Sequence, residues 1–138
     1  MKTAFLLGAV VVCFGFGPIF EKLSLREAGP MAVLTIRSVI ISVVLLGLLL
    51  FAGRTHELLG MTRITYAWIA GSSLVAGLVG LGLYFTVLQD GLASRVAAIT
   101  ASYPIVTALL AVVFLGEPYT LQRFLGTLLV VAGLMLVW

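Results

Sequence analysis

The chain alternates long apolar stretches with short segments that carry its charges, prolines and several glycines. Apolar runs of about 20 residues can cross the hydrocarbon core of a bilayer as helices, since a helix satisfies its own backbone hydrogen bonds. The pattern predicts five such helices, over residues 3–25, 31–51, 66–88, 96–115 and 121–138. We therefore expect an all-α integral membrane protein, a bundle of five transmembrane helices.

The predicted connections are short. "REAGP" ends the first helix because Gly29 and Pro30 break it, and "GRTHELLGMTRIT" forms the longest loop. Tyr66 and Trp68 open the third helix, where aromatic side chains favour the headgroup boundary. "QDGLASR" and "GEPYT" supply the remaining turns.

Composition supports a membrane protein, since 62% of the residues are hydrophobic and only 9% are charged. Soluble domains are about one quarter charged. The eight basic and five acidic residues are too few and too scattered for a nucleic-acid surface. No small-x-small cleavage site follows the first apolar run, so we expect an uncleaved first helix.

The sequence offers no chemistry of the kind that enzymes use. Cys13 is the single cysteine and lies in the first predicted helix, so no disulfide framework or cysteine metal cluster is available. We find no Ser/His/Asp or Cys/His set, no paired carboxylates and no metal-ligand spacing. We expect no enzyme activity, no cofactor and no metal.

Charged residues lie within the predicted spans. Glu21 is eight residues before Gly29 and Arg37 is eight after it, so a hairpin places them together, about 10 Å from the turn. Because an ionisable group in a membrane is costly and usually functional, Glu21, Lys22 and Arg37 are candidates to bind substrate or a coupling proton. The alternative is structural: long side chains reach the interface, and the ion pair fixes the hairpin.

Helix-breaking residues mark two further places. In "FGFGPIFEKL", Gly15, Gly17 and Pro18 weaken the helix just before its charges, as a hinge beside a cavity or as a kink for packing. Pro104 predicts a second kink, since it cannot donate to the Thr100 carbonyl. Neutral hydrogen-bonding side chains lie near this proline, at Ser102, Tyr103 and Thr107, and in the third helix, at Tyr84. They suit an apolar or zwitterionic solute. The alternative is that they form structural hydrogen bonds.

The stretch "SYPIVTALLAVVFLGEPYTLQRFLGTLLVVAGL" resembles the end of an EamA-type domain of the drug/metabolite transporter superfamily, through Pro104, Gly116-Glu117 and Gly126. "FGFGPIFEKL", Arg37 and "LYFTVLQDGLAS" are similar to its earlier part. The resemblance implies that residues 1–138 form a single EamA-like domain, one half of a ten-helix inverted-repeat architecture. It further implies a small multipass transporter that moves a metabolite or amphipathic small molecule by alternating access in the cell inner (plasma) membrane.

One such domain needs a second half. With the N-terminus inside, Lys2, Arg54, Arg63 and Arg123 face Lys22, Arg26 and Arg95 on the other side, which is almost no orientation bias. The expected partners are membrane lipid, a small-molecule substrate and a homodimer, antiparallel or single-orientation, or a homologous half-partner; nucleic acid is not among them. The alternative function is a non-transporting membrane subunit that scaffolds or stabilises a partner protein.

Overall fold

The computed structural model describes residues 2–118 and 120–136, and among these the side chains of all but Arg123, Leu134 and Met135. The described residues are helical throughout, with turns and short loops but no strand. In chain order the helices are α1 (Lys2–Ser24), α2 (Pro30–Phe51), α3 (His56–Leu59), α4 (Arg63–Ser72), the π-helix η1 (Ser73–Gly80), α5 (Leu81–Asp90), α6 (Ala93–Thr100), α7 (Tyr103–Leu115) and α8 (Leu121–Met135).

Four helical segments are long and apolar enough to cross a membrane: Lys2–Ser24, Pro30–Phe51, Arg63–Asp90 and Ala93–Leu115. They confirm the all-helical, multipass character expected from the hydrophobic pattern. The fifth predicted span, 121–138, extends outside the described residues at 137–138, and its described helix α8 has 15 residues. A length of about 20 residues is needed to cross the hydrocarbon core, so the fifth span stays a prediction.

Glycine and proline define the helix ends as their backbone preferences require. Gly29 is extended and precedes α2, whose first residue is Pro30, where a missing amide proton costs nothing. Gly53 and Gly116 follow α2 and α7 with a φ of 65°, the left-handed conformation in which glycine has no steric penalty. The turn at Gly29 and Pro30 and the turn at Gly116 are therefore where the sequence predicts them.

The third predicted span, 66–88, begins earlier and is internally irregular. Its helix starts at Arg63 because the Thr62 side chain accepts a hydrogen bond from the Thr65 amide and so caps the N-terminus. The middle of the span is the eight-residue π-helix η1, which the prediction of one regular helix missed. A wider turn inside an α-helix changes the direction of side chains on either side of it.

The fourth predicted span, 96–115, is not one helix but two. α6 ends at Thr100 and α7 begins at Tyr103, with Ala101 and Ser102 in a turn between them. The Ser102 hydroxyl donates to the Ile99 carbonyl at 2.6 Å, and Pro104 lies in the first turn of α7. A proline close after the break has no amide proton to continue the ladder of α6, which explains the interruption.

α1 is a continuous helix through Gly15, Gly17 and Pro18, the residues expected to weaken it. Proline removes a single ladder hydrogen bond, and membrane helices tolerate that loss when the neighbouring turns stay regular. Whether these three residues act as a hinge or as a kink for packing stays a prediction.

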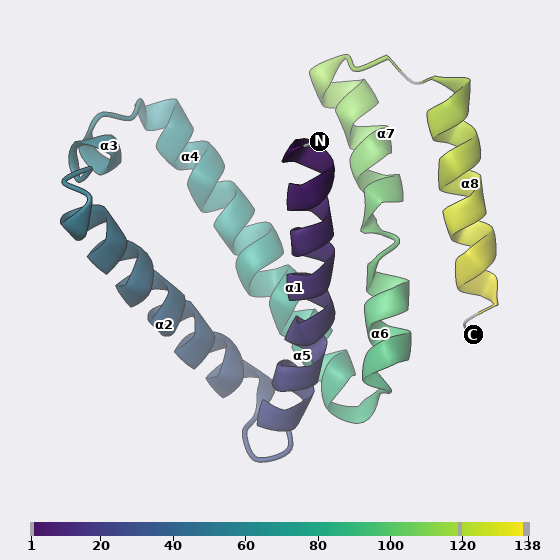
Figure 1. Cartoon of the computed structure of the whole chain (residues 1–138), viewed down its shortest axis with the longest axis horizontal. Helices are drawn as coiled ribbons and strands as arrows, with labels where there is room; N and C mark the ends of the chain where they lie inside the picture. Colours follow the sequence, from purple (N-terminus) through teal and green to yellow (C-terminus); the bar gives the residue numbers. More distant parts are fainter. Residues whose placement is uncertain (1, 119, 137–138) are drawn as a thin grey trace. The chain divides into compact units, whose positions relative to one another are not determined.

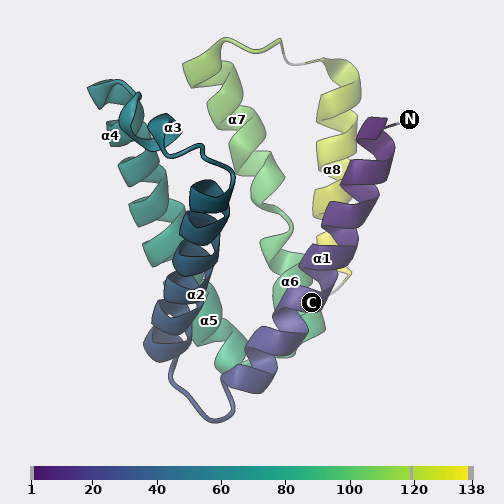
Figure 2. The same cartoon turned by 60° about the vertical axis from the view of Figure 1, so that its left-hand side comes forward.

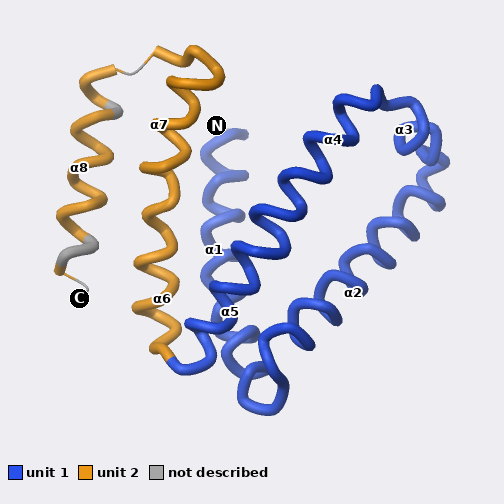
Figure 3. Tube along the Cα trace, turned by 180° about the vertical axis from the view of Figure 1, so that it is seen from behind, with its two compact units in different colours: residues 1–90 blue, residues 91–138 orange. Residues whose placement is uncertain are grey.

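The chain divides into two compact units, residues 1–90 and 91–138 (Figure 3). In the first unit, α1 and α2 diverge from their connecting turn, and α5 packs against both near that turn (Figures 1 and 2). The buried apolar side chains of this unit are Leu25, Leu34, Phe85 and Leu88, all in or next to the turn region. Most other large apolar side chains are exposed, as expected for helices surrounded by lipid or by another membrane protein.

Candidate functional site

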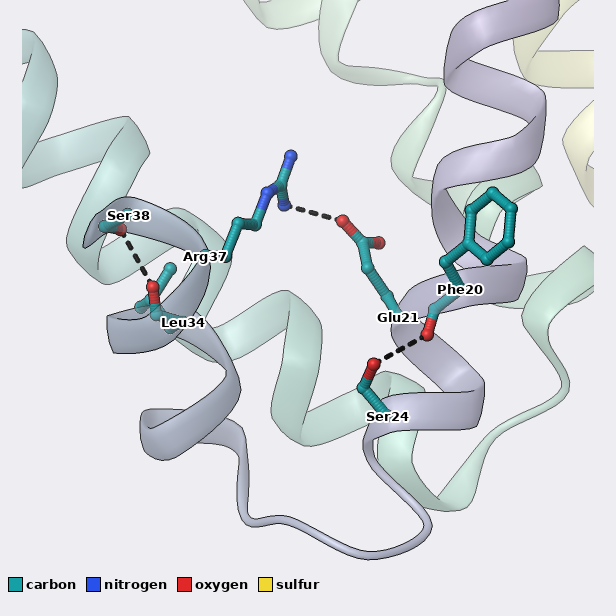
Figure 4. A network of polar contacts seen from close by, with 6 residues as sticks. All are labelled: Phe20, Glu21, Ser24, Leu34, Arg37 and Ser38. Atoms are coloured by element: carbon teal, nitrogen blue, oxygen red, sulfur yellow. Dashed lines mark hydrogen bonds and ion pairs between the residues drawn. The ribbon is translucent and has the colours of Figure 1, made fainter. Parts of the chain in front are cut away.

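The centre of the candidate site is an ion pair between α1 and α2. Arg37 Nη1 donates to Glu21 Oε1 at 2.6 Å, across the hairpin whose turn contains Gly29 (Figure 4). The Glu21 side chain is 14% exposed and that of Arg37 is 40% exposed. The pairing predicted from their equal distance to Gly29 is confirmed.

Two aromatic residues of α5 complete this cluster. The Arg37 guanidinium lies over the Phe85 ring, 5.7 Å from its centroid, and Phe85 is fully buried. Tyr84 precedes Phe85 on α5, with the two ring centroids 5.8 Å apart, and is close enough to the Glu21 carboxylate to influence its charge. The structure thus brings together Glu21, Arg37 and Tyr84, three of the predicted site residues, and adds Phe85 to them.

Lys22 occupies a different environment from its neighbour Glu21. Its Nζ donates to the carbonyls of Leu88 and Gln89 at 2.8 and 2.7 Å, at the C-terminal end of α5. The Gln89 side chain donates in return to the Leu25 carbonyl at 3.4 Å. Helix C-termini carry carbonyls without helical partners and a partial negative charge, so an ammonium group is well placed there. These contacts give Lys22 a structural role, since its ammonium group joins α1 to the C-terminal end of α5.

A hollow of about 320 Å³ lies beside Arg37, between the end of α1, the turn and the first half of α2. Its polar lining residues are Ser24 and Arg37. The rest of the lining is apolar and comprises Ala28, Val33, Ile36, Ile40 and Ile41. The Ser24 hydroxyl donates to the Phe20 carbonyl at 2.9 Å. Arg37 is the charged residue among those that line the hollow.

The predicted residues around Pro104 lie in the second unit. Ser102 bonds to the preceding helix, Tyr103 is exposed, and the Thr107 hydroxyl donates to the Tyr103 carbonyl at 3.2 Å. Tyr103, Pro104 and Thr107 line a groove of about 520 Å³ whose opposite wall is formed by α8. The groove is mainly apolar, and its lining also contains Glu117 and Thr127. Such a mixture is typical of sites for small molecules.

Sequence reasoning missed Phe85 and the carbonyl partners of Lys22. Phe85 could have been suspected, since it follows Tyr84 in an aromatic pair and arginine favours aromatic faces. Within residues 2–118 and 120–136, no group of three His, Cys, Asp or Glu side chains is arranged to hold a metal ion.

The profile of the EamA-like transporter family matches residues 1–138, the entire sequence. The chain belongs to the EamA-like transporter family. An uncharacterized protein of Methanocaldococcus jannaschii is 31% identical over 137 residues, which is 99% of this chain and 96% of that protein. An uncharacterized transporter of a Sinorhizobium species, described as lying in the cobO 3' region, is 29% identical over 118 residues, 86% of this chain and 83% of that protein. No solved structure matches.

Family membership and the apolar helices together make this a multipass membrane transporter. The family contains transporters rather than enzymes, in agreement with the expected lack of enzyme activity. Within that family, the polar cluster of Glu21, Arg37 and Tyr84 is the candidate site in the first unit, and the groove at Tyr103 is the candidate in the second.

Proposed function

We propose that this EamA-like protein moves a small metabolite or amphipathic molecule across the cell inner membrane by alternating access, with Glu21, Arg37 and Tyr84 in its transport path. The observation that carries the proposal is the ion pair of Glu21 and Arg37 inside two apolar spans. A charged side chain at the centre of a spanning helix costs about 3 kcal/mol on insertion scales. Pairing lowers that cost, and a binding role accounts for the presence of the charges.

The pair offers two means of transport chemistry. A half-exposed guanidinium can bind a polar group of the solute, and a carboxylate can exchange a proton between the two sides of the membrane. If Glu21 couples transport to protons, E21Q abolishes the dependence of uptake on a pH gradient. Unchanged coupled uptake in E21Q would remove Glu21 as the coupling residue.

We further propose that two domains assemble into the complete carrier, by pairing of two copies of this chain or of this chain with a homologous half. The two relatives support this assembly because they are matched over 96% and 83% of their own lengths, so each is about the size of one domain. Inverted repeats place the substrate at the interface of two such halves.

Transport is tested with purified protein in liposomes loaded with a mixture of cell metabolites, where solute loss is followed by mass spectrometry. We expect a subset of solutes to leave faster than from protein-free vesicles. The charge exchange E21R/R37E is the matched variant: it retains a pair of opposite charges and should fold, but transport should be lost because the charges face the solute in reversed positions. If the exchange variant still transports like the unmodified protein, the pair has a structural role. Vesicles that lose no solute favour the non-transporting subunit.

A further inference from the structure

The Arg37 guanidinium is held on two sides and open on a third. Nη1 is bonded to Glu21, and the face of the group lies over Phe85. Among the residues that the structure describes, Nη1 is the only donor of Arg37 with a hydrogen-bond partner. Figure 4 shows the other terminal nitrogen pointing away from the Glu21 carboxylate. Since the pair and the ring fix the plane of the guanidinium, its remaining edge is oriented before any ligand arrives.

The space next to this side chain matches a ligand of mixed character. The hollow of about 320 Å³ has aliphatic walls from Ala28, Val33, Ile36, Ile40 and Ile41, and Arg37 is its charged lining residue. An aliphatic body is favoured against such walls, and a planar carboxylate is the group that two parallel donors of arginine recognise.

The local charge also favours an anion. From Glu21 to Arg37 the hairpin carries three basic residues and two acidic ones, so its net charge is positive although Glu21 neutralises part of Arg37. The Glu21 carboxylate is bonded to Nη1 and does not occupy the remaining edge of the Arg37 guanidinium. Its negative charge nevertheless repels an anionic ligand at that edge.

We propose that the hollow between α1 and α2 binds the carboxylate form of a small aliphatic organic acid, with the carboxylate on the open edge of Arg37 and the aliphatic body against α2. This inference rests on the proposed transport function in so far as it names the substrate class, whereas binding itself is independent of transport.

The first test compares two probes of the same shape, isovalerate and its neutral amide isovaleramide, by calorimetric titration of the purified protein in detergent. We expect isovalerate to bind about tenfold more tightly, the equivalent of one charge-assisted hydrogen bond. Equal affinities, or no detectable binding of isovalerate, would overturn the proposal.

Variants locate the binding. R37K keeps a cation for Glu21 but lacks the planar edge, so it should lose about tenfold in affinity for isovalerate, whereas E21Q should bind it more tightly because a competing negative charge is gone. Weakened binding in E21Q, or full affinity in R37K, contradicts the proposed geometry.

A second pair of variants leaves Arg37 intact. I36W fills the hollow, and L48W adds the same side chain elsewhere on α2; Ile36 and Leu48 are 59% and 60% exposed, so both substitutions should be tolerated. We expect I36W alone to abolish isovalerate binding. Equal binding by both variants would place the ligand outside the hollow and overturn the proposal.

The binding experiments separate this inference from the transport proposal. Isovalerate that binds at Arg37 without being moved in liposomes supports the site and refutes transport of this class. Movement of other solutes by a protein that ignores isovalerate refutes the site and leaves transport intact.

Discussion

Lys22 and Arg37 are basic residues in the same helical hairpin, but their contacts assign them different tasks. Lys22 Nζ is bonded to two carbonyls at the end of α5, whereas Arg37 is bonded to Glu21 through Nη1 and lines a hollow. A bonded ammonium contributes to stability through the carbonyls that it satisfies. At the scale of single residues we therefore expect loss of Lys22 to affect folding first.

Removal of the Lys22 charge tests this assignment. K22M keeps the length of the side chain but leaves the Leu88 and Gln89 carbonyls without this donor, so unfolding should become easier by about 1–3 kcal/mol. Thermal unfolding in detergent measures the loss as a lower Tm. The control is K2M, in the exposed first turn of the same helix, which should unfold like the unmodified protein. A K22M protein that is as stable as K2M would contradict a structural role.

The same residues show what the sequence can predict. Glu21 and Arg37 are equally distant from a turn that Gly29 and Pro30 mark unambiguously, so their contact follows from helix geometry alone. The contacts of Lys22 and Phe85 depend on which face of α5 packs against α1 and α2. The hydrophobic pattern does not identify that face, because lipid and protein surroundings both favour apolar side chains within a span.

At the scale of elements, two of the apolar spans are irregular inside the membrane. η1 interrupts the span Arg63–Asp90, and a turn at residues 101–102 divides the span Ala93–Leu115. Hydrophobic patterning predicted both spans because it reports apolarity and length. It could not predict η1, because the hydrogen-bond register of a helix leaves no mark on hydropathy. Irregular turns within a span are places where a helix can bend.

Two glycines of η1 test whether its geometry constrains the sequence. A Cβ added at Gly80 would lie 3.3 Å from the Val75 carbonyl oxygen, whereas one at Gly77 would meet nothing within 4 Å. We expect G77A to be neutral or stabilising, since alanine favours helices, and G80A to be less stable than G77A by about 1 kcal/mol. Thermal unfolding of the two variants in one detergent decides. Equal stability would show that the π-helix adapts without cost.

Pro104 offers a test of the break between α6 and α7. P104A restores an amide that can donate to the Thr100 carbonyl and so extends the helical ladder across residues 101–105. Hydrogen exchange followed by mass spectrometry should show these amides exchanging about tenfold more slowly. P30A is the control, because Pro30 is the first residue of α2 and its amide is not needed for the helix. Unchanged exchange in P104A would mean that Ser102 and its neighbours maintain the turn without the proline.

At the scale of the whole molecule, the distribution of basic residues bears on how the chain is oriented in the membrane. In the predicted topology of residues 1–90, Lys2, Arg54 and Arg63 lie on one side of the membrane, and Lys22 and Arg26 lie on the other. The two sides therefore differ by only one basic residue. Orientation follows the side richer in Lys and Arg, and a near balance permits insertion both ways. An antiparallel pair of copies requires both orientations in the same membrane.

Two variants with one cysteine each measure the orientation directly. In a C13A background, H56C and E27C place a thiol beyond either end of α2, whose 22 residues separate them by about 33 Å. Because each molecule exposes one end outside the cell, the fractions labelled by a membrane-impermeant reagent at the two positions should add up to the whole. Dual insertion predicts about one half at each position. Complete labelling at one and none at the other would exclude an antiparallel homodimer and favour a single-orientation assembly or a homologous half. Permeabilised cells, where both thiols should react fully, provide the control for accessibility.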